Sequence, residues 1–361
     1  MNRREFLLAM AAGTGPDSPS PAQLDVWRAG EGGYHSYRIP ALMATRKGTL
    51  LAFCEGRKNA RSDTGDIDLV LRRSPDGGRT WTAQQVVADF GPDTIGNPCP
   101  VQDRATGTIW LPLTMNPGNE SQKEIEARSE KGTRTAWMTY SNDDGRTWAK
   151  PYEITRDVKA EGWTWYATGP GNAIQLRSGR MLAPCDHRDG KGPVSHVLYS
   201  DDHGKSWKLG GSTQADTDEC AVVELNDGSL LLNTRSYAGR NRRALARSSD
   251  GGLTWRDAGF DEALIEPVCQ ASFVRYDKRR LLFSNPASVK RERMTVRVSG
   301  DEGKTWAASR VIHAGPAAYS SLAALKDRSI GLLYERGEKS AYETITFSRF
   351  TLSWLMNGSN T

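Results

Sequence analysis

The chain has 361 residues, of which 37% are hydrophobic and 25% charged, with 36 glycines and 11 tryptophans. This balance excludes a largely disordered chain, and no segment offers the ~18 consecutive apolar residues that a membrane helix needs. The net charge of +5 is spread along the chain without a block of like charges, so no nucleic-acid-binding arm is indicated. A mild positive excess suits a small anionic partner instead.

The first 21 residues differ from the rest. Arg3 and Arg4 precede the short apolar run Phe6–Ala12, as in a twin-arginine export signal, and Pro16–Pro21 is typical of a linker. The alternative is an ordinary apolar terminus, since the run is short for a signal. We expect a periplasmic or secreted protein if the signal functions and a cytoplasmic one otherwise.

Two repeated elements follow in chain order. A turn leading into an apolar strand occurs six times, beginning at Gly48, Gly107, Gly179, Gly228, Arg279 and Arg328. The pattern S-x-D-x-G-x-[TS]-W, here called an Asp box, occurs five times, at Ser74–Trp81, Ser141–Trp148, Ser200–Trp207, Ser248–Trp255 and Ser299–Trp306. Its Asp suits a turn that binds backbone N–H groups, and its Gly supplies positive φ.

This periodicity predicts an all-β fold, a six-bladed β-propeller with five Asp-box hairpins. Residues 22–361 are predicted to form one domain. The sixth blade lacks a box. The apolar run 344–355 is predicted to continue as a strand to the C-terminus, and a strand near Leu24–Trp27 is expected to close the ring.

Counting along the hairpins places several polar residues on one rim. Glu219 lies seven residues before Asn226 and Arg235 seven after Gly228, which puts both opposite each other at the end far from the turn. Arg38 and Tyr319 likewise lie seven residues before their turns, Asn97 lies six before Asp103, and the loops 57–63 and 287–293 emerge on that rim. Inner strand ends of a propeller converge on its central channel, a common ligand site.

Together, the YRIP segment Tyr37–Pro40, the five boxes and the ordered rim residues resemble the exo-α-sialidase family with Asp-box (BNR) repeats. The resemblance covers the chain after Pro21. It implies a six-bladed enzyme that hydrolyses terminal α-linked sialic acid from glycoconjugates with retention. Boxes alone would not carry this inference, because they also occur in non-enzymatic propellers.

Carried over position by position, the resemblance implies a role for each rim residue. The arginine triad falls on Arg38, Arg235 and Arg291, with Arg293 as the alternative to Arg291. The acid/base falls on Asp63, the nucleophile on Tyr319, its partner carboxylate on Glu219 and a further substrate-contacting arginine on Arg57. Asn97 stands where the family often has aspartate, which puts the contact with the sugar's 4-hydroxyl in question.

Elementary chemistry fits these assignments. Guanidinium groups bind a carboxylate bidentately, and sialic acid carries a carboxylate on its anomeric carbon. A neutral phenol such as Tyr319 avoids the repulsion that a carboxylate nucleophile would meet there, but needs a base such as Glu219. Asp63 is preferred as acid/base over Asp66 and Asp68, which lead into a strand. Trp137, Trp163, Trp165 and Tyr166 are candidates for the wall of an N-acyl or glycerol pocket, and core packing is an equal alternative for them.

Other readings of the same residues remain open. A trans-sialidase or anhydro-forming sialidase would share every assigned residue, and so would a hydrolase of deaminated or eight-carbon keto-sugar acids. A non-catalytic sialic-acid-binding propeller would not need the Tyr319–Glu219 pair. The five cysteines are far apart and the five histidines lack metal-ligand spacing, so we expect neither disulfide, metal nor cofactor. The expected partners are sialylated glycans, and the protein is expected to be a monomer.

Overall fold

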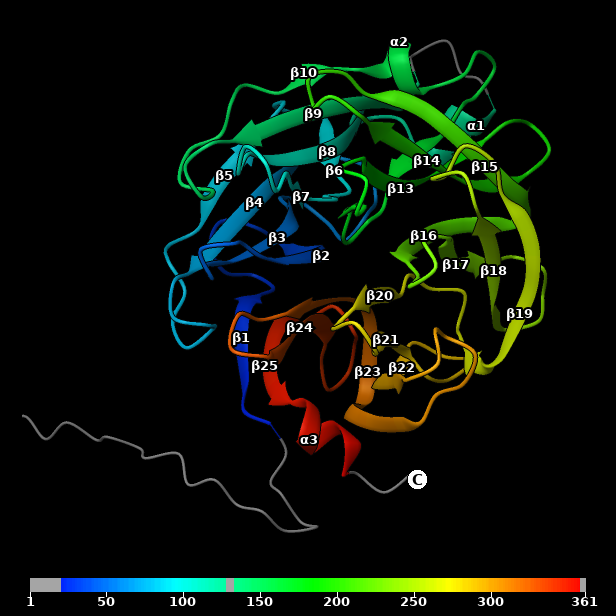
Figure 1. Ribbon diagram of the computed structural model, residues 1–361. Helices are drawn as coiled ribbons and strands as arrows, with labels where there is room; N and C mark the ends of the chain where they lie inside the picture. Colours follow the sequence, from blue (N-terminus) through cyan, green and yellow to red (C-terminus); the bar gives the residue numbers. More distant parts are fainter. Residues whose placement is uncertain (1–20, 128–132, 358–361) are drawn as a thin grey trace, which may run out of the picture.

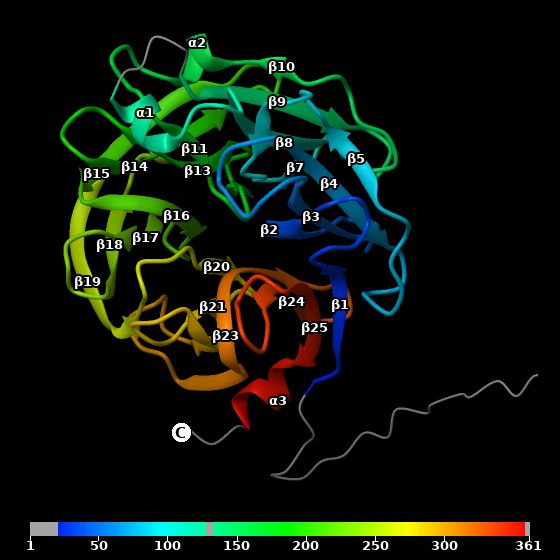
Figure 2. The same cartoon turned by 180° about the vertical axis from the view of Figure 1, so that it is seen from behind.

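The structure, a computed structural model, describes residues 21–127 and 133–357. The predicted export signal therefore lies outside the described residues. Within them the fold is all-β, and three helices of at most five residues accompany the strands. The sheets follow one another in chain order around a common centre, from the blue N-terminal strand to the red C-terminal one (Figures 1 and 2).

The strands form four hydrogen-bonded sheets. The first has the order β1 (Gln23–Arg28), β25 (Thr344–Thr351), β24 (Ser329–Arg336), β23 (Ala308–Ala324), β22 (Glu292–Ser299), β21 (Leu281–Pro286), β20 (Ser272–Arg275). The second has the order β10 (Tyr152–Glu153), β9 (Thr135–Ser141), β8 (Ile109–Asn116), β6 (Thr94–Gly96), β4 (Ile67–Ser74), β3 (Leu50–Arg57), β2 (Ser36–Ala44), with β5 (Gln85–Ala88) on β4 and β7 (Val101–Gln102) on β8.

The other two sheets are smaller. The third has the order β11 (Tyr166–Thr168), β13 (Met181–Arg188), β14 (Pro193–Ser200), β15 (Lys208–Ala215), with β12 (Ile174–Gln175) on β13. The fourth has the order β16 (Thr217–Glu224), β17 (Leu230–Ser236), β18 (Arg242–Ser248), β19 (Arg256–Ile265). The helices are α1 (Gln122–Glu126), α2 (Thr155–Val158) and α3 (Leu352–Met356).

Two pairings account for the size of the first sheet. Strand β23 pairs with β22 along its first half and with β24 along its second half, so it joins two hairpins. Strand β1 pairs antiparallel with β25, and Figure 1 shows the blue strand beside the red one. The predicted strand near Leu24–Trp27 is confirmed as β1, and it pairs with the last strand, β25.

The Asp boxes have one shared geometry. In the box between β18 and β19, Ser248 Oγ accepts from the Gly252 N–H at 2.9 Å, and Asp250 Oδ1 accepts from the Thr254 N–H at 3.0 Å. The Thr254 hydroxyl donates to Asp250 Oδ2 at 2.6 Å. The other four boxes repeat this network. Each box thus satisfies the turn's own backbone, as the sequence pattern predicts.

Box tryptophans pack across neighbouring hairpins. The Trp81 ring meets Phe347 of β25 edge-on with centroids 5.4 Å apart, and Trp148 meets Phe53 of β3 at 5.6 Å. The apolar core likewise lies between successive hairpins, as where Phe53 and Leu51 of β3 pack with Leu111 of β8. These contacts hold the hairpins side by side and fix where their inner ends meet.

The prediction that a strand runs from 344 to 355 is wrong at its end. Strand β25 stops at Thr351, whose side chain accepts from the Trp354 N–H at 3.1 Å and caps helix α3. Leu355 is buried and Phe350 packs on Trp354. A side-chain cap and one buried apolar residue therefore turn the chain into a helix. No helix within residues 21–127 and 133–357 is long and apolar enough to cross a membrane.

Candidate active site

A cavity of about 150 Å³ collects the predicted rim residues. Strands β2 and β16, which supply Arg38 and Glu219, lie toward the centre of the ring (Figure 2). All eight predicted site residues line this cavity: Arg38, Arg57, Asp63, Asn97, Glu219, Arg235, Arg291 and Tyr319. The structure therefore brings together every residue assigned from the sequence, while their chemical roles stay predictions.

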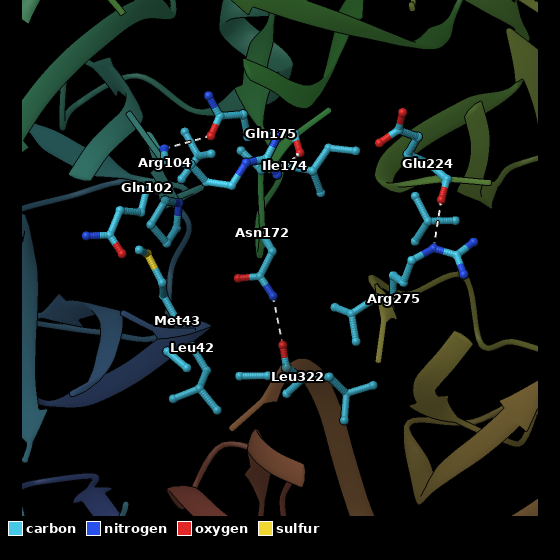
Figure 3. A pocket seen from close by; sticks show the side chains of 18 of the residues that line it. Leu42, Met43, Gln102, Arg104, Asn172, Ile174, Gln175, Glu224, Arg275 and Leu322 are labelled. Carbon is cyan, nitrogen blue, oxygen red and sulfur yellow. Dashed lines mark hydrogen bonds between the residues drawn. The ribbon is translucent and has the colours of Figure 1, made fainter. Parts of the chain in front are cut away.

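A second cavity, of about 500 Å³, has a different character (Figure 3). It is lined at the turn side of the inner strands by apolar residues such as Leu42 and Leu322, and Asn172 donates to the Leu322 carbonyl at 2.8 Å. Its Arg104 and Arg275 donate to backbone carbonyls of neighbouring segments. No predicted site residue lines it, so its greater volume does not make it the reactive site.

A phenol and a carboxylate are in direct contact in the smaller cavity. The Tyr319 hydroxyl on β23 donates to Glu219 Oε1 on β16 at 2.5 Å, and both residues are buried. Arg235 on β17 donates to Glu219 Oε2 at 2.9 Å and to Tyr319 Oη at 3.3 Å. The hairpin count predicted the meeting of Glu219 and Arg235, and the structure confirms it.

Burial governs the ionisation of this pair. It raises the pKa of the Tyr319 phenol well above its ordinary 10, and the negative charge of Glu219 raises it further. Burial also raises the pKa of Glu219, an effect that Arg235 opposes in part. The Tyr319 phenol is therefore neutral and donates its hydrogen bond to the Glu219 carboxyl group, which is the arrangement of a nucleophile with its base.

Arg38 is fixed by a carboxylate that the sequence analysis missed. Glu335 on β24 is wholly buried and accepts from Arg38 Nε at 3.0 Å and from Arg38 Nη2 at 3.4 Å. The same carboxylate accepts from the backbone N–H groups of Ile39 and Tyr319 at 2.9 and 3.0 Å. Because β24 pairs with β23, the hairpin count that located Tyr319 would also have located Glu335.

Arg291, and not Arg293, lines the cavity. Its Nη1 donates to the Tyr342 hydroxyl at 2.7 Å, and its guanidinium lies 5.7 Å from the centre of the Tyr319 ring. Arg293 is exposed, has a positive φ of 61° and does not line the cavity. The geometry favours Arg291 as the third cavity arginine.

Asp63 stands at the mouth of the cavity. Its side chain is 66% exposed and lies 2.8 Å from Arg57 Nη2 and 3.5 Å from Arg38 Nη1. Partial burial alone would raise the pKa of Asp63, but these two arginines hold the pKa below its ordinary 3.8. The rival carboxylates Asp66 and Asp68 bind Lys58 at 2.8 and 3.2 Å and do not line the cavity.

Glu55 supports the same side of the site. It accepts from Arg57 Nη2 at 2.6 Å and from the Asn97 N–H at 3.1 Å. A Cβ atom at Gly96 would lie 2.1 Å from Glu55 Oε1, so a residue without a side chain is needed beside Asn97. The Asn97 side chain faces Arg134, whose Nη2 donates to its Oδ1.

The four aromatic residues predicted to form a pocket wall lie in different places. Trp165 lines the cavity, with the Arg134 guanidinium 4.1 Å from its ring centre. Trp163 instead stacks on His187 at 3.3 Å, and Tyr166 is buried in the core between sheets. Trp137 packs against Phe90. The pocket-wall prediction is therefore supported for Trp165 alone. The other three do not line this cavity, because Trp137 and Tyr166 pack within the core and Trp163, in the loop before β11, stacks on His187.

The sequence analysis also missed Arg134, Asp186, Arg188 and Asp218, which line the same cavity. They stand at strand ends without any motif, so nothing in their local pattern marks them. Among the described residues no group of three or more His, Cys, Asp or Glu side chains is arranged to hold a metal ion. All five cysteines are buried and unpaired.

Comparisons with known proteins now bear on these observations. The family "BNR repeat-like domain" matches residues 48–334. The sialidase of Micromonospora viridifaciens is 37% identical over 93% of this chain, and the chain spans 55% of that relative's length. The exo-α-sialidase of Aspergillus fumigatus is 34% identical over 91% of the chain and 87% of the relative. The structure of the Hadza microbial sialidase Hz136 superposes with a TM-score of 0.85, at 32% identity, over 92% of this chain and 69% of that one.

These matches agree with the structure, in which a phenol–carboxylate pair lies beside several arginines in one cavity. The class of protein is therefore glycoside hydrolase. Within that class, the chain belongs to the sialidase family with BNR repeats.

Proposed function

We propose that the protein is an exo-α-sialidase that hydrolyses terminal α-linked sialic acid from glycoconjugates and retains the anomeric configuration. The observation that carries this proposal is the 2.5 Å hydrogen bond from the Tyr319 hydroxyl to Glu219, beside Arg235. A binding protein would need the arginines but not a buried phenol paired with a base. Arg38, Arg235 and Arg291 surround the position for the sugar's carboxylate.

The first step forms a covalent intermediate. Tyr319 Oη attacks the anomeric carbon C2 while the bond between C2 and the glycosidic oxygen breaks, and Glu219 takes the phenol proton. Asp63 gives its proton to the departing oxygen. A phenol suits this attack because it approaches a carbon that already bears a carboxylate.

The second step releases the sugar. A water molecule attacks C2, Asp63 takes a proton from that water, and the bond between C2 and Tyr319 Oη breaks. Glu219 returns its proton to the phenol oxygen. Two displacements at one carbon give net retention.

We further propose that the four sheets make six blades of four strands. The shared strand β23 and the pairing of β4 with β6 join neighbouring blades into larger sheets. Strand β1 would then complete the last blade as its outer strand on β25. This arrangement supports the site, because each inner strand would end at the central cavity.

We also propose that the enzyme acts as a monomer on sialylated glycans. We propose that it is periplasmic or secreted if residues 1–21 direct export, and cytoplasmic otherwise. Cell fractionation of a tagged full chain, with and without Arg3→Lys and Arg4→Lys, tests the location.

Proton NMR of the products from an aryl α-N-acetylneuraminide or its 5-hydroxy analogue tests the activity. We expect the free sugar to appear first as the α-anomer and then to mutarotate. First appearance of the β-anomer would contradict retention. Release of an anhydro sugar, or transfer to an added acceptor in place of water, would contradict hydrolysis.

A further inference from the structure

The position of the sugar's carboxylate and C2 determines which substituent of the sugar faces the rest of the cavity. If the carboxylate and C2 lie at Arg235 and Tyr319, as proposed above, C5 lies opposite C2 across the six-membered ring. The substituent on C5 therefore faces the far wall of the cavity. We define the far wall as the cavity-lining residues Asn97, Arg134, Trp165, Asp186 and Arg188, which lie on or next to strands of the second and third sheets, whereas Tyr319 and Arg235 belong to the first and fourth. The argument rests on the proposed function and concerns the same site.

Charged side chains make up most of this far wall. Arg134 is 3% exposed and donates to Asn116 Oδ1 at 2.9 Å and Thr114 Oγ1 at 2.9 Å. Burial lowers the pKa of Arg134 to about 10. Its ring contact covers one face of Trp165, which is the largest apolar side chain of this wall.

An acidic group stands on the same wall. Asp186, at the end of β13, is 1% exposed and lies 3.5 Å from Arg188 Nη1. Arg188 forms a shorter ion pair, 2.7 Å, with Asp218. Burial and the neighbouring Asp218 raise the pKa of Asp186. The far wall therefore contains positively and negatively charged side chains and has little apolar surface.

Two polar atoms of this wall have no hydrogen-bond partner among the described residues. They are Arg134 Nε, a donor, and Asp186 Oδ2. Buried polar atoms without partners are rare in folded proteins, and a ligand group is one way to satisfy them. A hydroxyl group both donates and accepts, so it can serve Arg134 and Asp186 in either ionisation state of Asp186.

An acetamido group fits this wall poorly. It can also donate and accept, but its methyl group needs an apolar recess. Here the methyl would face Arg134, Asp186 and Arg188 and could not supply the hydrogen bonds that Arg134 Nε and Asp186 Oδ2 lack, which is unfavourable for buried polar groups. A group that leaves buried polar atoms unpaired is rejected more strongly than one that merely differs in size.

We propose that the preferred substrate is the deaminated sialic acid, which carries a hydroxyl at C5 in place of the acetamido group. Arg134 and Asp186 are the residues that determine this specificity. They contact the C5 substituent and take no part in the displacement at C2.

A matched pair of substrates tests the proposal. The purified full chain is given the 4-methylumbelliferyl α-glycosides of N-acetylneuraminic acid and of its 5-hydroxy analogue, and kcat/KM is measured for each. We expect kcat/KM to be at least about tenfold higher for the 5-hydroxy glycoside. An equal or higher value for the N-acetyl glycoside would overturn the proposal while leaving the proposed sialidase activity intact. Hydrolysis of neither glycoside would overturn both.

Variants assign the preference to this wall. The ratio of the two kcat/KM values within one preparation does not depend on the fraction of folded enzyme. We expect Arg134→Leu to lower the ratio at least about tenfold. Asp186→Asn, which keeps the shape of the side chain, should lower it in the same direction and serves if Arg134→Leu does not fold.

Arg297 offers a matched control. It is also a buried arginine whose pKa burial lowers to about 10, and it donates to Asn285 Oδ1 at 3.0 Å, but it does not line the cavity. Arg297→Leu should leave the ratio within about twofold of the natural value. Unchanged ratios in both Arg134→Leu and Asp186→Asn would overturn the assignment of specificity to this wall.

Discussion

At the scale of single residues, the two carboxyl groups flanking the reaction have opposite pKa shifts. Arg57 and Arg38 hold the pKa of Asp63 below 3.8, while burial raises that of Glu219. The proposed first step needs Asp63 protonated and Glu219 ionised, and the direction of each pKa shift opposes the form that the step needs. A bound substrate carboxylate offsets the charge of Arg38 and so raises the pKa of Asp63 toward the value an acid needs.

The role of Asp63 can be tested through the leaving group. A poor leaving group needs a proton, whereas an activated phenol departs without one. We expect Asp63→Asn to lower kcat/KM by roughly 10²–10⁴-fold on a sialyl-galactoside and by less than about tenfold on a nitrophenyl sialoside, both carrying the preferred sugar. Asp66→Asn, which alters a carboxylate bound to Lys58, is the control and should change neither value. Equal losses on both substrates in Asp63→Asn would argue against the acid role.

At the scale of elements, the Asp boxes are turns held by ionised carboxylates. Burial tends to raise the pKa of Asp250, but the hydrogen bonds from Thr254 outweigh it and lower the pKa to about 2. Folding therefore favours the ionised form. The stabilisation is present above about pH 4 and is lost as the pH falls through about 2.

Because folding lowers the pKa of Asp250, the Asp boxes should be less stable in acid. We expect Asp250→Asn to lower the free energy of unfolding by about 1–2 kcal/mol at pH 7 and by less at pH 2, because the natural carboxylate is then protonated. Urea unfolding at the two pH values measures the difference. Asp189→Asn, in a turn without a box, should have a small effect at both. A loss for Asp250→Asn that is the same at both pH values would contradict the account.

The elements also show how far the sequence predicts the site. Regular hairpins allow residues to be counted from a turn, and this count is sufficient to place Arg38, Glu219 and Tyr319 on one rim. The C-terminal strand was overextended because a Thr cap at Thr351 is indistinguishable from a strand residue in an apolar run. Arg134 and Asp186 were missed because only the packing of two sheets, one with β9 beside Arg134 and one with β13 carrying Asp186, brings them together.

At the scale of the whole molecule, the first described strand, β1, pairs with the last, β25. Trp27 of β1 is 2% exposed, its ring lies 6.0 Å from that of Tyr37, and its Nε1 donates to Gln84 at 2.9 Å. Strand β1 thus connects the last hairpin to the first through packing as well as through its pairing with β25. The cavity lies where these two hairpins meet, since Arg38 of β2 and Glu335 of β24 form an ion pair there.

Loss of this closure should be measurable. We expect Trp27→Ala to lower the free energy of unfolding by about 3–5 kcal/mol. Leu24→Ala, at a 43% exposed position of the same strand, should change it by no more than about 0.5 kcal/mol. Thermal or urea unfolding compares the two, and similar small effects would mean that β1 does not hold the ring together.

The nucleophile is the central claim, and trapping it is the most direct test. A sialic acid analogue of the preferred sugar with fluorine at C2 and C3 slows both displacements but keeps a good leaving group, so the intermediate accumulates. We predict that mass spectrometry of the digested protein finds one added sugar on the peptide containing Tyr319, and none in Tyr319→Phe. A sugar attached to Glu219, Asp63 or another peptide, or undiminished turnover in Tyr319→Phe, would contradict the account.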